Sequence, residues 1–206
     1  MIEWSNISKR ISYHTYEMKE FIPDSSGFYA WYFPLWLYEE DLVEYISMVT
    51  KIFSYEDKAD STDGYVNILH DFNWSSLNLK VKLEGHQINP CSDSLISDWK
   101  EAMTSPEARE VLEQAMMTAS IIMPPLYVGK ADNLKSRYEQ HTVHSGFKDR
   151  FDNFMKEVDV NITVADLIFC SVKLEPDLNI KLRKRKLNEL VEQVIMRMAA
   201  PPFSKQ

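Results

Sequence analysis

The spacing of apolar residues divides the chain into short strands and amphipathic helices. Aromatic or β-branched runs at 27–33, 126–129 and 165–174 predict three strands, and alternation at 78–83 predicts a fourth short one in an otherwise polar stretch. Apolar residues recurring every three or four positions predict helices at 38–53, 94–104, 106–121, 133–142, 147–157 and 179–199. The segment 55–64 is acidic and polar, which predicts a loop. We therefore expect an α+β fold.

Three features mark where helices begin and end. Pro106 suits the first turn of its helix, because the N–H that proline lacks would have no helical partner there. Asp132 is expected to cap the helix at 133–142, because a carboxylate can accept hydrogen bonds from the first backbone N–H groups. The prolines at 124–125 stop the preceding helix.

Composition places the chain among ordinary soluble globular proteins. Of its 206 residues, 45% are hydrophobic and 26% are charged. No apolar run approaches the ~20 residues of a membrane-spanning helix, and the N-terminus lacks the apolar block of a secretory signal. Cys91 and Cys170 are too few for a disulfide framework and are expected to be free thiols. We therefore expect a cytoplasmic protein without a membrane partner.

Charge is distributed unevenly along the chain. The net charge is −8, but residues 30–126 carry −10 whereas residues 127–206 carry +3. The densest basic run is 181–186, which includes Arg183, Lys184 and Arg185. Such a run is typical both of a solvated helix face and of a surface that contacts phosphates. A polyanion would be repelled by the middle of the chain and accepted by its end.

Two strand triplets and one helix carry the most specific pattern. Without residues 32–124, the expected order is strand, strand, helix, helix, strand, helix. The first two strands contain Gly27-Phe28-Tyr29 and Tyr127-Val128-Gly129. Arg137 follows Tyr127 by ten residues, and His141 follows Arg137 by four, one helical turn further on.

This arrangement resembles the GIY-YIG nuclease family, which has an arginine and often a histidine at these offsets. The resemblance covers residues 27–31 and 125–204. It implies a small mixed or antiparallel three-stranded sheet flanked by helices. In this interpretation residues 1–31 and 125–206 form the nuclease core, and residues 32–124 form an acidic, mostly helical insertion.

The end of the chain supplies the metal ligand that the resemblance implies. The family carries one metal-binding glutamate on its last helix, before an ending of proline, an aromatic residue and asparagine. Glu192 matches this position, and Glu189, one turn earlier, is the second candidate. Ser204 stands where the family usually has asparagine. The implied cofactor is one Mg²⁺ or Mn²⁺ ion.

These residue types also suit phosphodiester hydrolysis on chemical grounds. One carboxylate can hold one hard cation that keeps several waters, and an arginine offers a fork for phosphate oxygens. Tyr29 and Tyr127 can orient or deprotonate a water if the metal or a neighbouring cation makes Tyr29 more acidic. The candidate phosphate contacts are Lys130, Lys135, Arg183, Lys184 and Arg185. The catalytic candidates are Tyr29, Tyr127, Arg137, His141 and Glu192.

Each candidate also has a plain structural interpretation. The tyrosines can be ordinary strand aromatics, Arg137 and His141 a solvated helix face, and Glu192 a surface carboxylate. The combined order and spacing favour a metal-dependent DNA endonuclease of a prokaryotic defence or restriction type. The alternatives are a non-catalytic nucleic-acid-binding or assembly subunit, and an RNA-cleaving toxin.

The role of the insertion is open at the level of sequence. Its tryptophans and methionines are expected to form a core of its own. Its acidic surface is a candidate docking face for a protein partner, which we favour, or a lid over the basic cleft. A dimer is also compatible with the sequence.

Overall fold

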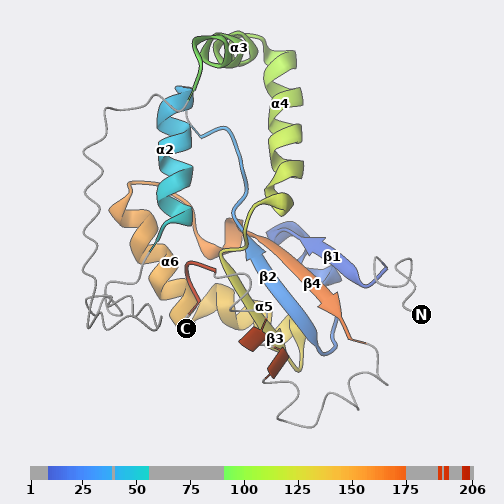
Figure 1. Ribbon diagram of the computed structural model, residues 1–206. Coiled ribbons are helices and arrows are strands. Elements are labelled where there is room, and N and C mark those ends of the chain that lie inside the picture. The colour runs from blue at the N-terminus through green and yellow to red at the C-terminus, as the bar shows by residue number, and fades with distance from the viewer. Residues whose placement is uncertain are drawn as a thin grey trace, which may run out of the picture.

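The computed structural model describes residues 9–38, 40–55, 91–174, 190–191, 193–194 and 201–204. It confirms the α+β class: one antiparallel sheet has the strand order β1-β4-β2-β3 (Figure 1). The strands are β1 (Ile11–His14), β2 (Gly27–Tyr32), β3 (Tyr127–Ala131) and β4 (Ile168–Lys173). The expectation of three strands is wrong, because β1 adds a fourth by pairing with β4.

The helices follow the expected order within a few residues at each end. Between β2 and β3 the chain forms α2 (Leu42–Phe53), α3 (Asp93–Thr104), α4 (Pro106–Ala119) and the 3₁₀ turn η2 (Ser120–Ile122). After β3 it forms α5 (Leu134–Val143), α6 (Gly146–Glu157) and the 3₁₀ turn η3 (Val164–Asp166). One further 3₁₀ helix, η1 (Tyr16–Phe21), follows β1.

Short polar side chains define the helix starts. Pro106 lies in the first turn of α4, as expected, and the hydroxyl of Ser105 caps that helix. For α5 the expectation was off by one residue. The cap is Asn133, whose side chain accepts a hydrogen bond from the Ser136 amide, whereas Asp132 lies one position before it.

One face of the sheet is covered by α5 and α6. Because alternate residues of a strand share a face, Tyr29 and Trp31 of β2 point to the same side. Trp31 is fully buried and stacks on Tyr138 of α5, with ring centroids 5.4 Å apart. The ring of Phe147 in α6 also lies beside Trp31, with centroids 6.0 Å apart. This packing fixes α5 directly over Tyr29.

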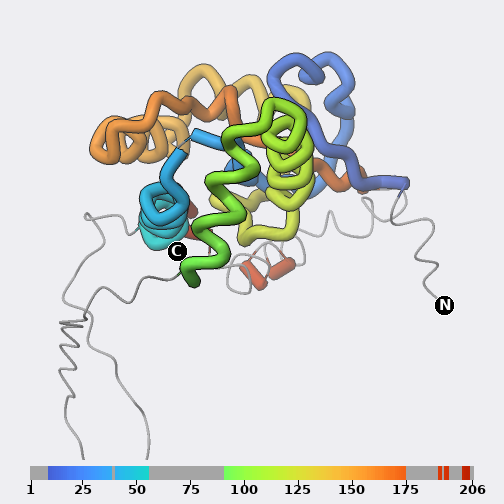
Figure 2. Tube along the Cα trace, turned by 90° about the horizontal axis from the view of Figure 1, so that it is seen from above, coloured from blue at the N-terminus to red at the C-terminus, as the bar shows by residue number. Residues whose placement is uncertain are grey.

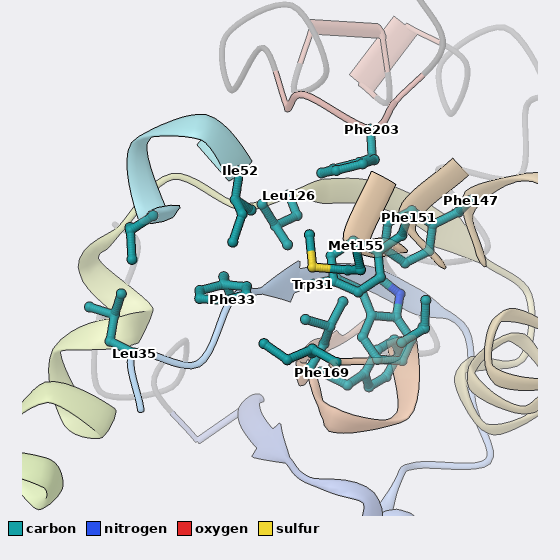
Figure 3. Packing of buried hydrophobic residues seen from close by; sticks show 14 of the residues in the cluster. Trp31, Phe33, Leu35, Ile52, Leu126, Phe147, Phe151, Met155, Phe169 and Phe203 are labelled. Carbon is teal, nitrogen blue, oxygen red and sulfur yellow. The ribbon is translucent and has the colours of Figure 1, made fainter. Parts of the chain in front are cut away.

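The insertion shares its core with the sheet instead of forming a separate one. The chain leaves β2 through Phe33 and Leu35, which continue the buried cluster, and Ile52 of α2 belongs to the same cluster (Figure 3). Trp99 of α3 packs on Tyr45 of α2 at 5.4 Å. The expectation of an independent core is therefore wrong for the described residues, because apolar residues run without a break from the strand into the insertion.

The outer part of the insertion projects from this core. Figure 1 shows α2 and α4 rising from one end of the sheet, and Figure 2 shows α3 between them. In α4 no residue is fully buried, and Val111 is 67% exposed. No helix in the described ranges combines the length and the apolar character needed to cross a membrane.

The segment 201–204 returns to the core beside β3. Phe203 is fully buried; its amide donates to the Leu126 carbonyl at 3.0 Å, and its own carbonyl accepts from Arg150 Nη2 at 2.6 Å. Tyr55, just after α2, stacks on its ring with centroids 4.2 Å apart. Figure 3 shows the Phe203 ring close to Leu126 and Phe151. The C-terminal segment thus joins the core and the insertion.

Several expectations lie outside the described residues. They are the strand at 78–83, most of the loop at 55–64 and most of the helix at 179–199. Within the last of these, Leu190, Val191, Gln193 and Val194 are helical. Glu189, Glu192, Arg183, Lys184 and Arg185 are not among the described residues.

Candidate functional site

Two residues of α5, Arg137 and His141, meet the phenol oxygen of Tyr29, which lies more than 100 positions earlier in the sequence. Arg137 Nε donates a hydrogen bond to Tyr29 Oη at 3.0 Å. Tyr29 Oη lies 2.8 Å from His141 Nε2 on the same helix, one turn further along. Tyr29 and His141 are only 3% and 2% exposed, whereas Arg137 is partly exposed. The arrangement therefore joins a buried phenol and imidazole to a cation that reaches solvent.

Tyr127 completes this group from the neighbouring strand. Its ring stacks near that of Tyr29, with centroids 6.1 Å apart, and lies edge-on to His141 at 5.1 Å. Phe147 packs against its ring at 4.8 Å. Tyr127 is half-buried, so its ring forms a boundary between the aromatic core and the solvent-facing side of the group. Four of the five catalytic candidates are thus brought together.

The position of the Tyr29 phenol explains why the second triplet ends in a glycine, Gly129. In the sheet register Tyr29 lies opposite Gly129. A Cβ atom on Gly129 would stand 2.5 Å from Tyr29 Oη and 2.7 Å from its Cζ. Because no real Cβ contact is that short, a side chain at this position would displace the phenol. Gly129 therefore sets the position of the Tyr29 oxygen against Arg137 and His141.

Helix α5, which carries Arg137 and His141, is held in place by its buried residues and its N-cap. Leu134 and Tyr138 are buried, and the Leu134 amide donates to the Ser25 carbonyl at 2.9 Å. The Asn133 cap fixes the other end of the first turn. With these residues packed inward, Arg137 and His141 lie on the side that faces Tyr29. Arg137 Nη1 also donates to Gln140 Oε1, which restrains the guanidinium.

Ser145 is a member of the group that the sequence did not indicate. Its Oγ lies 3.1 Å from His141 Nδ1, and it accepts a hydrogen bond from the Lys148 amide at 3.1 Å as the cap of α6. Both ring nitrogens of His141 therefore have partners. A serine directly before a helix predicts a cap, but its link to His141 depends on how α5 and α6 are folded against each other.

Burial dominates the electrostatics of the site. Burial, with help from the charges of Arg137 and Arg150, lowers the pKa of His141 from 6.5 to about 3. Burial and the Tyr127 phenol raise the pKa of Tyr29 above its usual value, although Arg137 acts in the opposite direction. At neutral pH the described site therefore holds a neutral imidazole and a neutral phenol beside one arginine cation. Arg137 does lower the pKa of Tyr29, as expected of a neighbouring cation, but burial raises that pKa by more.

The candidate phosphate contacts separate on the two sides of α5. Lys130 lies 3.9 Å from Asp132 and lines an open pocket of about 360 Å³ together with Arg137 and Gln140. Lys135 points to the other side, where its Nζ pairs with Glu20 of η1 at 2.9 Å. Lys130 is thus beside the site and Lys135 is not. The other three candidates, Arg183, Lys184 and Arg185, lie outside the described residues.

A metal ion would depend on a residue beyond the described part. Among the described residues no three His, Cys, Asp or Glu side chains gather as a metal-binding group. The polar groups at the site are phenols, a guanidinium and a neutral imidazole, and none of them is the carboxylate that Mg²⁺ prefers. Glu192, which lies outside the described residues, is the carboxylate that the family resemblance implies for this role.

Comparisons with known proteins give no relative from which a function could be inferred. No protein-family model, no curated protein and no solved structure matches this chain. The assignment of function therefore rests on the residues and their contacts.

Proposed function

We propose that the chain is a metal-dependent endonuclease of the GIY-YIG type that hydrolyses phosphodiester bonds in DNA. The observation that carries the proposal is the hydrogen-bonded chain from Arg137 through Tyr29 to His141. These are the residues that the family resemblance selects, and Tyr29 lies more than 100 positions from the two residues of α5. Tyr29 and His141 are buried and Arg137 reaches solvent, and this arrangement supports a shared chemical task.

The cation and the proton acceptor have separate tasks in this proposal. Arg137, restrained by Gln140 and by Tyr29, offers its remaining N–H groups to phosphate oxygens and to the charge that develops on phosphorus. Tyr29 takes the proton of the attacking water while its own phenol proton passes to His141 Nε2. Because His141 is neutral at physiological pH, its acceptor nitrogen is available before the reaction begins.

The phosphate itself favours this proton transfer. In the free protein, the positive charges of Arg137 and Arg150 disfavour a charged His141, in addition to burial. An anionic phosphate bound at Arg137 offsets that repulsion, so its arrival raises the proton affinity of the imidazole. The base is therefore weak without substrate and stronger with it.

In this proposal the protein ligand of the divalent cation is the carboxylate of Glu192. In the proposal its carboxylate would hold one Mg²⁺ or Mn²⁺, which when bound supplies charge neutralisation at the phosphate and the leaving oxygen. Glu189 is the second candidate for the same role. All other steps above use residues of the described site.

Features of the sequence extend the proposal to the substrate and the biological setting. DNA is proposed because the chain has no basic-aromatic sequence pattern typical of RNA recognition, and a defence or restriction role fits a nuclease core with its own insertion. The acidic insertion is proposed as a docking face for a protein partner. Its exposed outer helices and net negative charge support this over contact with DNA.

A cleavage assay tests the proposal. Purified protein is incubated with plasmid DNA, single-stranded DNA and RNA, each with Mg²⁺, Mn²⁺ or chelator. We expect cleavage of DNA that requires the metal and falls by at least ~10³-fold in Arg137→Ala, with little recovery in Arg137→Lys, because a point charge lacks the bidentate fork. Glu192→Gln should abolish cleavage.

The matched control is Arg109→Ala, which removes one arginine from α4 in the insertion. It should cleave like the wild type. Cleavage of RNA alone would replace DNA as the substrate. Wild-type cleavage by both Arg137→Ala and Glu192→Gln would refute the nuclease assignment.

A further inference from the structure

A buried histidine between two hydroxyl groups has two ways to share its hydrogens. In the neutral ring of His141, one nitrogen carries the hydrogen and the other accepts. Nε2 faces Tyr29 Oη at 2.8 Å, and Nδ1 faces Ser145 Oγ at 3.1 Å. Which nitrogen carries the hydrogen decides whether His141 can take a proton from Tyr29.

The partners of Tyr29 select one arrangement. Arg137 Nε can only donate, so the bond at 3.0 Å uses a lone pair of Tyr29 Oη. The phenol hydrogen then needs an acceptor, and His141 Nε2 is the acceptor nitrogen within hydrogen-bond distance. If Nε2 carried the hydrogen instead, the oxygen would accept twice and the buried phenol hydrogen would lose this partner. Leaving a buried donor unpaired costs ~1–3 kcal/mol.

The Ser145 hydroxyl completes the same arrangement. Its Oγ already accepts from the Lys148 amide, because it caps α6. The hydroxyl keeps one lone pair and one hydrogen, so it can complete either tautomer; in the tautomer that the partners of Tyr29 favour, it accepts the hydrogen of His141 Nδ1. The helix cap also fixes where the oxygen lies, since Ser145 can move only if it gives up the first turn of α6.

We propose that Ser145 is a positioning residue that holds His141 in the tautomer with hydrogen on Nδ1, which leaves Nε2 free to accept the Tyr29 proton. The α6 cap thereby acts on Tyr29 through the imidazole ring. The consequence for catalysis rests on the proposed function, whereas the tautomer is a property of the free protein. Ser145 contacts His141 at Nδ1, whereas the proton is exchanged at Nε2 on the other side of the ring.

Nitrogen NMR of the histidine rings tests the tautomer without substrate. In uniformly ¹⁵N-labelled full-length protein at neutral pH, with the His141 signals assigned by comparison with His141→Gln, wild-type His141 should show a protonated Nδ1 and an unprotonated Nε2. Ser145→Gly removes the hydroxyl and costs the helix cap only a few tenths of a kcal/mol. In that variant we expect a mixture of both tautomers. Ser145→Asp keeps a capping acceptor and should restore the wild-type pattern.

The matched control is Ser105→Gly, which removes the equivalent capping hydroxyl from α4, where it accepts from the Ala108 amide. Its histidine signals should equal those of the wild type. A wild-type spectrum with hydrogen on Nε2, or a Ser145→Gly spectrum identical to the wild type, would overturn the inference.

Kinetics separate this inference from the proposed function. If the chain cleaves DNA, Ser145→Gly should lower kcat about tenfold with little change in KM, and Ser145→Asp should recover most of the loss. If the NMR pattern is as expected and no substrate is cleaved, the inference stands and the nuclease assignment fails. If cleavage is found and the tautomer is unchanged in Ser145→Gly, the nuclease assignment stands and Ser145 has no positioning role.

Discussion

Within the described residues, two buried histidines are paired with serines on the same side of one sheet, and they differ in what surrounds them. His14 of β1 is 3% exposed, and its Nε2 lies 3.2 Å from the fully buried Ser171 of β4. Its Nδ1 has no hydrogen-bond partner of normal geometry within the described part of the chain. His141 has partners at both nitrogens, and one of them, Tyr29, is bonded to an arginine.

The difference teaches that burial alone does not distinguish the candidate catalytic histidine from a packing one. Burial lowers the pKa of both rings; for His14 the backbone of Met18 partly opposes the shift, and for His141 the nearby arginines add to it. Only His141 connects through hydrogen bonds to a group that reaches solvent. We therefore interpret His14 as a packing residue of the sheet edge, whereas His141 is the histidine to which the proposed function gives a proton-transfer role.

Replacing each histidine separately gives the largest expected contrast. His141→Gln should lower the cleavage rate by ~10²–10⁴-fold, the usual contribution of a general base, because Tyr29 loses its proton acceptor. His14→Gln should leave the rate per folded molecule unchanged. Cleavage kinetics with folding checked by circular dichroism measure both. Equal losses in the two variants would show that the contrast is only one of folding.

Filling the space beside Tyr29 sharpens the contrast without removing any polar group. Gly129→Ala should lower cleavage by about 100-fold, because its Cβ would push Tyr29 Oη away from Arg137 and His141. The control is Gly146→Ala, whose Cβ would meet only the end of the Arg150 side chain at 3.3 Å. A crystal structure or the His141 NMR signals of Gly129→Ala should show the displaced phenol. Wild-type activity in this variant would remove Tyr29 from the mechanism.

Acid should destabilise the protein through both histidines, but more through His141. The pKa of His141 is about 3 in the folded protein and about 6.5 when unfolded, so the unfolded chain binds one more proton between these values. The free energy of unfolding should thus fall as pH drops through this window, by ~1.4 kcal/mol per pH unit for His141.

Denaturant unfolding at pH 7, 6 and 5 measures this slope. His141→Gln should reduce the slope, because the variant has no ring to protonate. His14→Gln should reduce it less, because the backbone of Met18 partly opposes the shift of the His14 pKa. An unchanged slope in His141→Gln would mean that the folded ring is already protonated or exposed.

The smallest expected effect comes from the serine beside His14. Ser171→Ala removes the hydroxyl that lies 3.2 Å from His14 Nε2 and should cost ~1–2 kcal/mol of stability. For a chain of this size the melting temperature should fall by roughly 2–8 °C. Cleavage should be unaffected at temperatures below the transition. A loss of cleavage in folded Ser171→Ala would indicate that Ser171 of β4 also contributes to the candidate site.

The elements with strong periodicity were predictable, and those that depend on distant partners were not. The aromatic strand β2 and the helices α3 and α4 follow from local pattern and capping residues. Strand β1 was missed because it has only four residues, and its pairing with β4 is what makes it a strand. The Asn133 cap was misassigned because Asp132 and Asn133 have similar capping preference.

The candidate site was predictable in its members but not in its contacts. The spacing of Arg137 and His141 places both on one helix face, and the family resemblance links them to Tyr29 and Tyr127. Periodicity does not reveal that Gly129 makes room for the phenol or that Ser145 holds the imidazole. Both depend on the sheet register and on the packing of α5 against α6. The role of Glu192 stays a prediction.

The order of the strands has a consequence for how the chain folds. Tyr29 pairs with Gly129, 100 positions later, and with Ser171, 142 positions later, while Tyr13 pairs with Cys170, 157 positions later. No described strand pair is a hairpin, so each pairing must close a long loop before it gains a hydrogen bond. Slow folding with late assembly of the sheet is expected. Arg137 and His141 can share a helix early, but they meet Tyr29 only when these long loops have closed, so we expect a partly folded chain to lack the assembled candidate site.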